Sequence, residues 1–180
     1  GYGHGTHVAG ILAGIGVTIS GKPYTGPYFS ELNYDEFKIR PGVAPKAKLF
    51  ALKVFGDNAL GSTGVVLDAL EWCVDPNKDN QFDDRMDVVN LSLSTILGLE
   101  EKHEIEAEAF RNLSSIGCVV VAASGNSNNN NFYLVGAPGV ERSVICVGAS
   151  KLDGETQRIA TLSARGPSSP YSLLKPEIVA

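Results

Sequence analysis

The sequence contains few of the residues that mark several large classes of protein. Its three cysteines are an odd number and lie far apart, which excludes a disulfide framework and the closely spaced cysteine pairs of zinc sites. No uninterrupted apolar run approaches the roughly 20 residues that a membrane-spanning helix needs. The 15 Lys and Arg residues are scattered and outnumbered by 20 Asp and Glu residues, so the basic patch of a nucleic-acid-binding protein is missing.

What is present suits a globular protein with a buried core. Hydrophobic residues make up 43% of the 180 residues, charged residues make up 19%, and the mean hydropathy is +0.02. This length corresponds to one domain or a large part of one. The chain begins at Gly1 without a methionine and ends at Ala180 inside an apolar segment. We therefore expect a piece of a larger domain, with any signal peptide upstream of it.

Apolar spacing along the chain predicts alternating helices and strands. Helical spacing marks residues 4–13, 65–74 and 99–117, and strand patterns mark residues 47–55, 86–94, 119–123 and 143–149. Strands separated by helices form βαβ units, which build a parallel sheet with helices on both faces. The sequence therefore predicts an α/β fold in one domain over residues 1–180, with a Gly-, Pro- and Tyr-rich surface insertion at about 16–41.

The segment GHGTHVAG (3–10) is the first candidate site. Glycines on both sides of His4 allow close backbone approach, and His4 is expected at the N-terminus of a helix. The positive end of the helix dipole disfavours the imidazolium form, which keeps the ring available as a base near neutral pH. The alternative is that His4 and His7 are capping or packed histidines, and for His7 we favour that alternative. A metal pair is disfavoured because no HExxH pattern or carboxylate partner follows.

The segment VVVAASGN (119–126) is the second candidate site. Its apolar run is typical of a strand buried on both faces, and Asn126 would emerge at the carboxyl end of that strand, where active residues of parallel sheets gather. An amide fixed there can donate a hydrogen bond to an oxyanion during acyl transfer. Taken by itself, an ordinary Gly-Asn turn is the better explanation of this segment.

Taken together, several segments follow one another in an order that belongs to a single family. They are HGTHVAG (4–10), GVAPKAKLFALKV (42–54), MDVVNLSLS (86–94), VVVAASGN (119–126), SVICVGA (143–149), SARGP (163–167) and LKPEIVA (174–180). In these segments the chain resembles the subtilisin-like serine proteases, or subtilases, of peptidase family S8. The resemblance covers nearly the whole chain outside the insertion. It implies a three-layer α/β fold with a mainly parallel sheet, and serine endopeptidase activity through an Asp-His-Ser triad.

The resemblance also implies roles for individual residues. His4, the first histidine of HGTH, corresponds to the general base of the triad, and Asn126 corresponds to the amide of the oxyanion hole. The specificity pocket that the resemblance implies is apolar, which suggests cleavage after large apolar residues. Ser94 stands where the family usually has a glycine, so we also expect the mouth of this pocket to be narrowed. The implied substrate-binding residues are Ala59, Leu60 and Gly61 at the edge that pairs with extended substrate, Ser92, Leu93 and Ser94 on one pocket wall, and Ala123, Ser124 and Gly125 on the opposite wall.

Two parts of the triad do not match any residue of this chain. The family's aspartate lies upstream of the histidine, and its nucleophilic serine follows the segment that corresponds to LKPEIVA (174–180). Neither Ser124 nor Ser163 sits on a matching nucleophile turn. Without a serine to deprotonate, His4 cannot take part in forming an acyl-enzyme. We therefore expect the parent protein to be an endopeptidase and these 180 residues alone to be inactive.

Two other functional classes were weighed against the protease. A non-catalytic relative of the family, used for binding or assembly, stays open as the alternative. A dinucleotide-binding domain is disfavoured, because Gly3, Gly5 and Gly10 do not follow the GxGxxG spacing and no strand precedes them. For the protease we expect polypeptide substrates in an extended conformation, no catalytic cofactor, no nucleic-acid partner, a monomer, and an extracellular or cell-surface location.

The polar loop DPNKDNQFDD (75–84) suggests a structural calcium site. Oxygen-bearing side chains at alternate positions match the first five ligand positions of an EF-hand loop, in which a curling backbone aims every second side chain at one cation. Asn80 replaces the turn glycine, and Met86 replaces the final glutamate, so affinity would be modest. A solvated acidic loop is the alternative. The candidate ligands are Asp75, Asn77, Asp79, Gln81 and Asp83.

Overall fold

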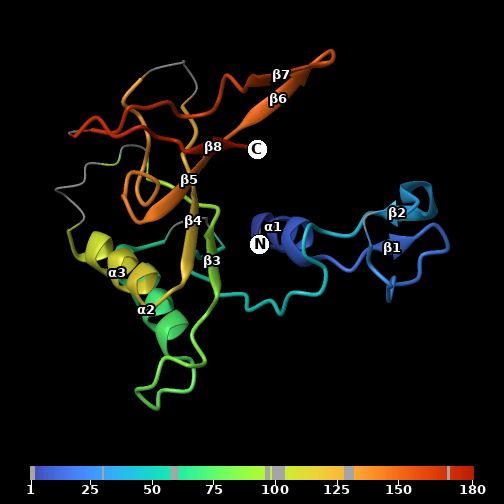
Figure 1. Ribbon diagram of the computed structural model, residues 1–180, viewed down its shortest axis with the longest axis horizontal. Coiled ribbons are helices and arrows are strands. Elements are labelled where there is room, and N and C mark those ends of the chain that lie inside the picture. Colours follow the sequence, from blue (N-terminus) through green and yellow to red (C-terminus); the bar gives the residue numbers. More distant parts are fainter. Residues whose placement is uncertain are drawn as a thin grey trace. The chain divides into compact units, whose positions relative to one another are not determined.

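The computed structural model describes residues 3–29, 31–57, 61–95, 98, 104–127, 132–169 and 171–180. The chain divides into two compact units, unit 1 (Gly1–Ser62) and unit 2 (Thr63–Ala180), and each is described by itself. Figure 1 shows their elements in sequence colours. No helix among the described residues is both long and apolar enough to cross a membrane.

Unit 1 contains a helix and a small hairpin lobe (Figure 1). The helix α1 (His4–Ala13) has the predicted bounds and follows Gly3, whose φ of 70° lies in the left-handed region. The lobe lies within the insertion expected at about 16–41, and it is more regular than a surface loop. Its strands β1 (Val17–Thr18) and β2 (Phe37–Ile39) pair antiparallel, with the single-turn 3-10 helix η1 (Tyr34–Glu36) before β2.

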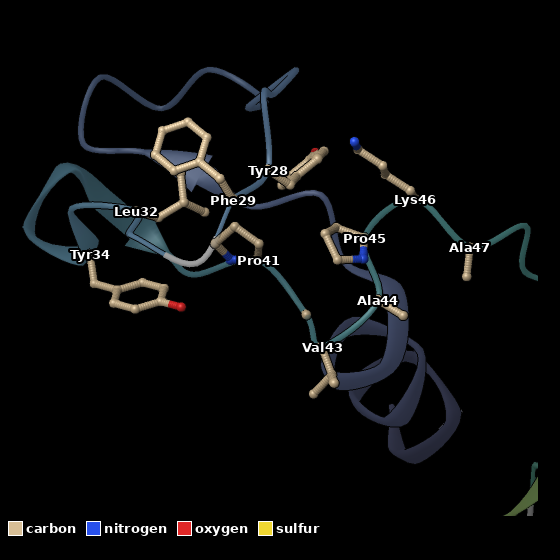
Figure 2. A pocket seen from close by; sticks show the side chains of 11 residues that line it. Tyr28, Phe29, Leu32, Tyr34, Pro41, Val43, Ala44, Pro45, Lys46 and Ala47 are labelled. Carbon is tan, nitrogen blue, oxygen red and sulfur yellow. The ribbon is translucent and has the colours of Figure 1, made fainter.

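Aromatic side chains hold this lobe together. The ring of Tyr24 meets the rings of Tyr28 and Phe37 edge-on, with centroids 5.3 and 4.9 Å apart. The hydroxyl of Tyr28 also donates to the carbonyl of Ile15, 3.0 Å away, so the lobe is tied to the chain that leaves α1. A pocket of about 480 Å³ lies beside it, lined by aromatic and proline side chains together with residues 42–47 (Figure 2).

The strand predicted at 47–55 is not formed. These residues are all described, and their β-type pairing is the isolated bridge between Phe55 and Gly61. An alternating apolar pattern specifies a surface that could join a sheet, but a strand also needs a ladder of hydrogen bonds to a neighbour. The pattern alone therefore overestimated the regular structure of this segment.

Unit 2 contains a parallel sheet, as predicted (Figure 1). In its described part, four strands lie in the order β3 (Val88–Leu91), β4 (Val119–Ala123), β5 (Val144–Gly148) and β8 (Ile178–Val179). All neighbours in this order are parallel, which confirms the α/β fold class. The two central strands match the predicted ranges closely. Strand β3 is shorter than the predicted 86–94 because its last residues leave the ladder.

The helices α2 (Thr63–Val74) and α3 (Glu104–Ser115) pack on one face of this sheet. Helix α3 ends at Ser115, and the predicted stop residue Gly117 follows it with a φ of 92°, where the amide of Cys118 donates to the carbonyl of Leu113, 3.1 Å away. The core between the helices and the sheet is formed by Leu70, Cys73, Leu91, Phe110, Leu113, Cys118, Val120, Ala122 and Val144.

A hairpin that the sequence analysis missed follows β5. Strands β6 (Ser150–Asp153) and β7 (Thr156–Ile159) pair antiparallel around Gly154, whose φ is 63°. The Asp-Gly pair at this turn is a strong hairpin signal and could have revealed it. All of its strand residues except Ser150 are exposed, so no buried apolar pattern drew attention to the segment.

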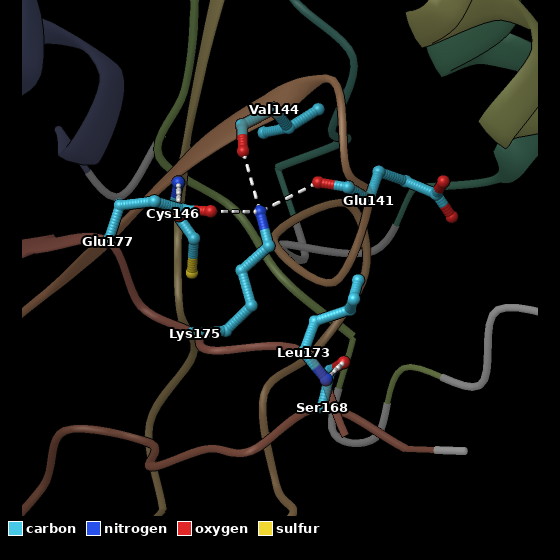
Figure 3. Close-up of polar contacts among 7 residues, drawn as sticks. All are labelled: Glu141, Val144, Cys146, Ser168, Leu173, Lys175 and Glu177. Atoms are coloured by element: carbon cyan, nitrogen blue, oxygen red, sulfur yellow. Dashed lines mark hydrogen bonds and ion pairs between the residues drawn. The ribbon is translucent and has the colours of Figure 1, made fainter. Parts of the chain in front are cut away.

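The short strand β8 is attached to the sheet by a buried lysine (Figure 3). The Lys175 side chain is 2% exposed, and its Nζ donates to the carbonyls of Glu141 and Val144 at 2.7 and 2.8 Å. It also forms an ion pair with Glu177 Oε1 at 2.6 Å, and Glu177 Oε2 accepts the amide of Cys146. Because three acceptors surround the ammonium group, its burial is compensated.

Candidate functional site

The carboxyl ends of the parallel strands in unit 2 carry the second candidate segment. After β4, the amide of Ser124 still donates to the carbonyl of Val147 on β5, 2.9 Å away. Gly125 then adopts a φ of 96°, a conformation that favours glycine, and turns the chain. Asn126 follows as an exposed residue. The sheet therefore presents Asn126 at the edge where it was predicted.

A second segment supports this turn from its other side. The amide of Ser127 donates to the carbonyl of Leu162 at 2.7 Å, and the amide of Ala164 donates to the carbonyl of Gly125 at 2.9 Å. Between these two hydrogen bonds, Asn126 and Ser163 form an antiparallel bridge. The backbone at Asn126 is thus held by residues 162–164 as well as by the sheet.

The two predicted pocket walls lie against each other in unit 2. Ser92, Leu93 and Ser94 are half-buried, and Ser94 Oγ donates to the carbonyl of Thr95 at 2.9 Å. A Cβ atom placed on Gly125 would lie only 2.8 Å from Ser94 Oγ. The structure therefore brings Ser94 from one wall next to Gly125 of the other, and the serine hydroxyl occupies space beside the glycine.

Thr95 connects this region to the chain before β5. Its amide donates to the carbonyl of Ala137, and its side-chain oxygen accepts the amide of Ala137, both at 2.9 Å. Gly136 lies so close to Ser94 that a side chain at this position would collide with the serine hydroxyl. Ser94 is therefore enclosed by backbone on more than one side.

The first candidate segment lies in unit 1. His4 is the first residue of α1 and is exposed, as is His7. Gly3 precedes the helix and supplies no side-chain cap, so the helix N-terminus keeps its partial positive charge beside His4. None of the ten residues of α1 is buried, although the helix is mostly apolar.

The predicted edge for extended substrate is described only in part. Ala59 and Leu60 lie outside the described residues. Gly61 is exposed and pairs with Phe55 through an antiparallel bridge. A Cβ atom at Gly61 would lie 2.5 Å from the Phe55 ring, so this close approach requires glycine.

The polar loop between α2 and β3 turns its oxygen atoms toward its own backbone. Asp75 accepts the amides of Asp79 and Asn80 at 3.2 and 2.8 Å, one on each carboxylate oxygen. Asp79 in turn accepts the amide of Gln81 at 2.8 Å. Asn80 has a φ of 64°, so asparagine does take the left-handed position expected of the turn glycine.

These contacts bear on the predicted calcium ligands. Asn77 accepts the amide of Asp79 through its side-chain oxygen, so a third candidate ligand is also engaged with the loop backbone. Among the described residues, no group of three or more His, Cys, Asp or Glu side chains is placed to hold a metal ion. Calcium binding stays a prediction, and it would compete with these hydrogen bonds to the loop backbone.

The three cysteines are free and buried. Burial raises the pKa of the Cys73 thiol to about 11 and that of Cys146 to about 12. Burial also raises the pKa of Cys118, in spite of the nearby Arg85. Thiols that stay protonated near neutral pH are poor nucleophiles, so these side chains belong to the core rather than to a catalytic site.

The sequence analysis missed the supporting role of residues 162–164. In the sequence, SARGP (163–167) was recognised only as a family segment. In the structure, Ser163 is buried and the preceding Leu162 is exposed, outside any helix or strand. A buried polar residue outside regular structure is a signal that its side chain has a specific partner. The contacts of Ser163 became visible only in the folded chain.

Comparisons with known proteins show which family this chain resembles. Residues 1–180 match the family model Peptidase_S8, described as the subtilase family. Serine protease AprX of Bacillus subtilis is 34% identical over 99% of this chain and 37% of its own length. Subtilisin E of Bacillus subtilis is 31% identical over 91% of this chain and 35% of its own length. Minor extracellular protease Epr of the same organism is 29% identical over 94% of this chain and 21% of its own length.

Solved structures lead to the same family. The S41 psychrophilic protease superposes with a TM-score of 0.63 and 25% identity, over 79% of this chain and 46% of that protein. Sphericase gives a TM-score of 0.63 and 26% identity, over 78% and 45% of the two chains. The chain thus spans less than half the length of the relatives described here.

Proposed function

Since the chain belongs to the subtilase family, we propose that the protein that contains it is a subtilisin-like serine endopeptidase. In this proposal His4 is the general base, and Asn126 donates a hydrogen bond to the oxyanion. The aspartate and the serine of the triad are supplied by parts of the protein outside these 180 residues. The 180 residues by themselves are then inactive, because His4 has no serine hydroxyl to deprotonate.

The chemistry assigned to the two residues is simple. His4 takes the proton of the serine hydroxyl as it attacks the peptide carbonyl, and later gives that proton to the leaving amine. The carbonyl oxygen becomes negatively charged in the tetrahedral intermediate, and the Asn126 side-chain amide stabilises this charge. Peptide hydrolysis needs no further cofactor in this scheme.

The observation that carries the proposal is the placement of Asn126. It is exposed at the carboxyl end of a central parallel strand, with its backbone held on both sides by hydrogen bonds. An oxyanion donor must be fixed before the charge develops, since reorganisation during the reaction would cost free energy. The turn after β4 supplies such a fixed support.

Substrate recognition is proposed at the two pocket walls. An extended polypeptide would place one side chain between residues 92–94 and residues 123–125, and pair its backbone with the edge at residues 59–61. The contact between Ser94 and Gly125 supports the expectation of a narrowed pocket. We therefore expect small side chains to be accommodated better than the large apolar ones that the pocket's apolar character would otherwise favour.

A structural calcium ion and an extracellular location complete the proposal. The curled backbone at Asn80 supports a calcium loop, whereas the amide contacts of Asp75 and Asp79 mean that binding must compete with existing hydrogen bonds. An extracellular or cell-surface location is supported by relatives such as the minor extracellular protease Epr. We expect the protein to act as a monomer.

The test is peptide hydrolysis by the full-length gene product, with Asn126→Ala as the decisive variant. We expect kcat to fall by about 100- to 1000-fold with little change in KM, the effect known for this donor in subtilisin itself. The 180-residue chain alone serves as the inactive control. Unchanged kcat in Asn126→Ala would refute the oxyanion assignment, and a folded full-length protein without peptidase activity would favour the non-catalytic alternative.

A further inference from the structure

We propose that Ser163 is a positioning residue for Asn126. Its buried hydroxyl fastens residues 162–164 to the end of β5, and these residues in turn hold the turn that carries Asn126. The inference rests on the proposed oxyanion role of Asn126. It assigns Ser163 a part in the reaction that is neither nucleophilic nor in contact with substrate.

The hydroxyl of Ser163 is engaged on both sides. Ser163 is 1% exposed, and its Oγ accepts the amide of Ala149, the first residue after β5, at 3.0 Å. The same hydroxyl donates to the carbonyl of Ala164 at 3.3 Å. Gly148 leaves room for it, since a Cβ atom at that position would lie 3.0 Å from Ser163 Oγ. These contacts connect residues 162–164 to the sheet.

The same short segment contacts the turn at Asn126 through its backbone. Leu162 accepts the amide of Ser127, and Ala164 donates to Gly125, so one hydrogen bond lies on each side of Asn126. The bridge between Asn126 and Ser163 lies between them. Asn126 therefore cannot shift away from the sheet edge without breaking contacts to residues 162–164.

Removing the hydroxyl would loosen this connection. In Ser163→Ala the amide of Ala149 loses its acceptor in a buried place, and the segment keeps only a backbone link to the end of β5, from the amide of Ala160 to the carbonyl of Ala149. The backbone hydrogen bonds that join residues 162–164 to the turn at Asn126 would then lack this side-chain support. Oxyanion donors act at about 2.7–3.1 Å, and a displacement of about 1 Å can cost 100-fold in rate.

The experiment measures kcat and KM of the full-length gene product on a chromogenic peptide. We expect Ser163→Ala to lower kcat about 5- to 20-fold with KM unchanged, because a displaced oxyanion donor weakens only the transition state. Ser168→Ala is the matched control. Ser168 is 2% exposed and its hydroxyl accepts the amide of Leu173 at 3.1 Å (Figure 3), and its hydrogen bonds among the described residues do not include the turn at Asn126. An equal fall in kcat for Ser168→Ala would overturn the proposal.

A double-mutant cycle separates positioning from a general structural role. In the Asn126→Ala background, Ser163→Ala should change kcat less than about twofold, since the group that it positions is gone. A fall by the same factor as in the wild-type background would show that Ser163 acts through another group, and would overturn the inference. If Asn126→Ala itself leaves kcat unchanged, the proposed function fails instead.

Hydrogen exchange tests the support without relying on activity. The amides of Ser127 and Ala164 should exchange faster in Ser163→Ala than in the wild type and in Ser168→Ala, because their acceptors belong to the loosened contact. Unchanged exchange at both amides would overturn the positioning role whatever the kinetics show. Should Ser163→Ala fail to fold, Ser163→Cys keeps the side-chain shape with a weaker acceptor, and the same two measurements apply.

Discussion

The two candidate catalytic side chains stand on supports of different kinds. Asn126 follows β4, a strand in the middle of the described sheet, and helices α2 and α3 pack on one face of that sheet. Hydrogen bonds from the sheet and from residues 162–164 hold the turn that carries Asn126. His4 begins a helix that buries none of its residues in unit 1. The immediate ties of α1 are backbone hydrogen bonds from Val43 and Ala44 to its last turn. Unit 2 thus determines the geometry at Asn126 by itself, whereas unit 1 leaves the apolar side chains of its helix without a core.

The largest expected effect is a loss of activity on substitution of His4, which tests the difference between the two candidate catalytic residues. In the full-length protein, His4→Ala should abolish peptide hydrolysis, with a loss of about 10⁴-fold or more in kcat, since the serine loses its base. Thermal stability should change little, because the His4 side chain is exposed. Kinetics and a melting curve of the same preparation check both statements. His7→Ala is the control, and an equal loss of activity in that folded variant would show that the two roles were misassigned.

A variant in unit 2, by contrast, should change the stability of the protein. Lys175→Met removes the ammonium group that three acceptors surround, so the carbonyls of Glu141 and Val144 lose its hydrogen bonds, and the carbonyl of Glu141 keeps the amide of Val144. We expect a loss of about 2–4 kcal/mol in the free energy of unfolding. Urea denaturation measures it, with exposed Lys151→Met as the control. A stability within experimental error of the wild type would mean that β8 does not depend on this lysine.

The contact between the pocket walls predicts a change of specificity. Ser94→Gly should raise kcat/KM for peptides with phenylalanine or leucine before the cleaved bond, relative to alanine, by about tenfold. Ser94→Ala, which keeps the Cβ atom, should stay close to the wild type. The ratio of kcat/KM values over a peptide series is the measurement. An unchanged ratio in Ser94→Gly would mean that the serine does not limit the pocket.

The smallest expected effect concerns the loop at 75–84, which is supported by its own side chains rather than by the sheet. If the loop binds calcium, adding calcium should raise the melting temperature by a few degrees, which corresponds to about 1 kcal/mol. Asp79→Ala should remove that rise, whereas Asp153→Ala, in the distant hairpin, should keep it. A melting temperature that does not respond to calcium would leave a solvated acidic loop as the correct interpretation.

The sequence predicted the two helices of unit 2 and its strands β3, β4 and β5. A run of apolar residues such as 119–123 can be satisfied only by burial on both faces, and the structure has a strand with these bounds. Gly117 marked the end of α3 because a left-handed residue closes the helix there. These signals are local in sequence, so they predict a helix end or a buried strand without knowledge of the tertiary contacts.

Prediction failed where the outcome depends on partners far away in sequence. The segment 47–55 has a strand-like pattern but no ladder, and the hairpin β6–β7 forms although its side chains are mostly exposed. The sequence predicted a surface insertion at about 16–41 without naming elements in it, and contacts among Tyr24, Tyr28 and Phe37 organise part of it. The sequence does not show which of the aromatic residues scattered between glycines and prolines will contact one another.

The sequence by itself determined the α/β class, the family, and the candidate residues His4 and Asn126, because motif and periodicity are properties of neighbouring residues. Only the tertiary structure decided what surrounds them. It placed Ser94 against Gly125, enclosed Lys175 with three acceptors, and joined Ser163 to both Ala149 and the turn at Asn126. Apart from the ion pair of Lys175 with Glu177, these contacts join residues separated by 14 or more positions, and such pairings depend on the assembled sheet.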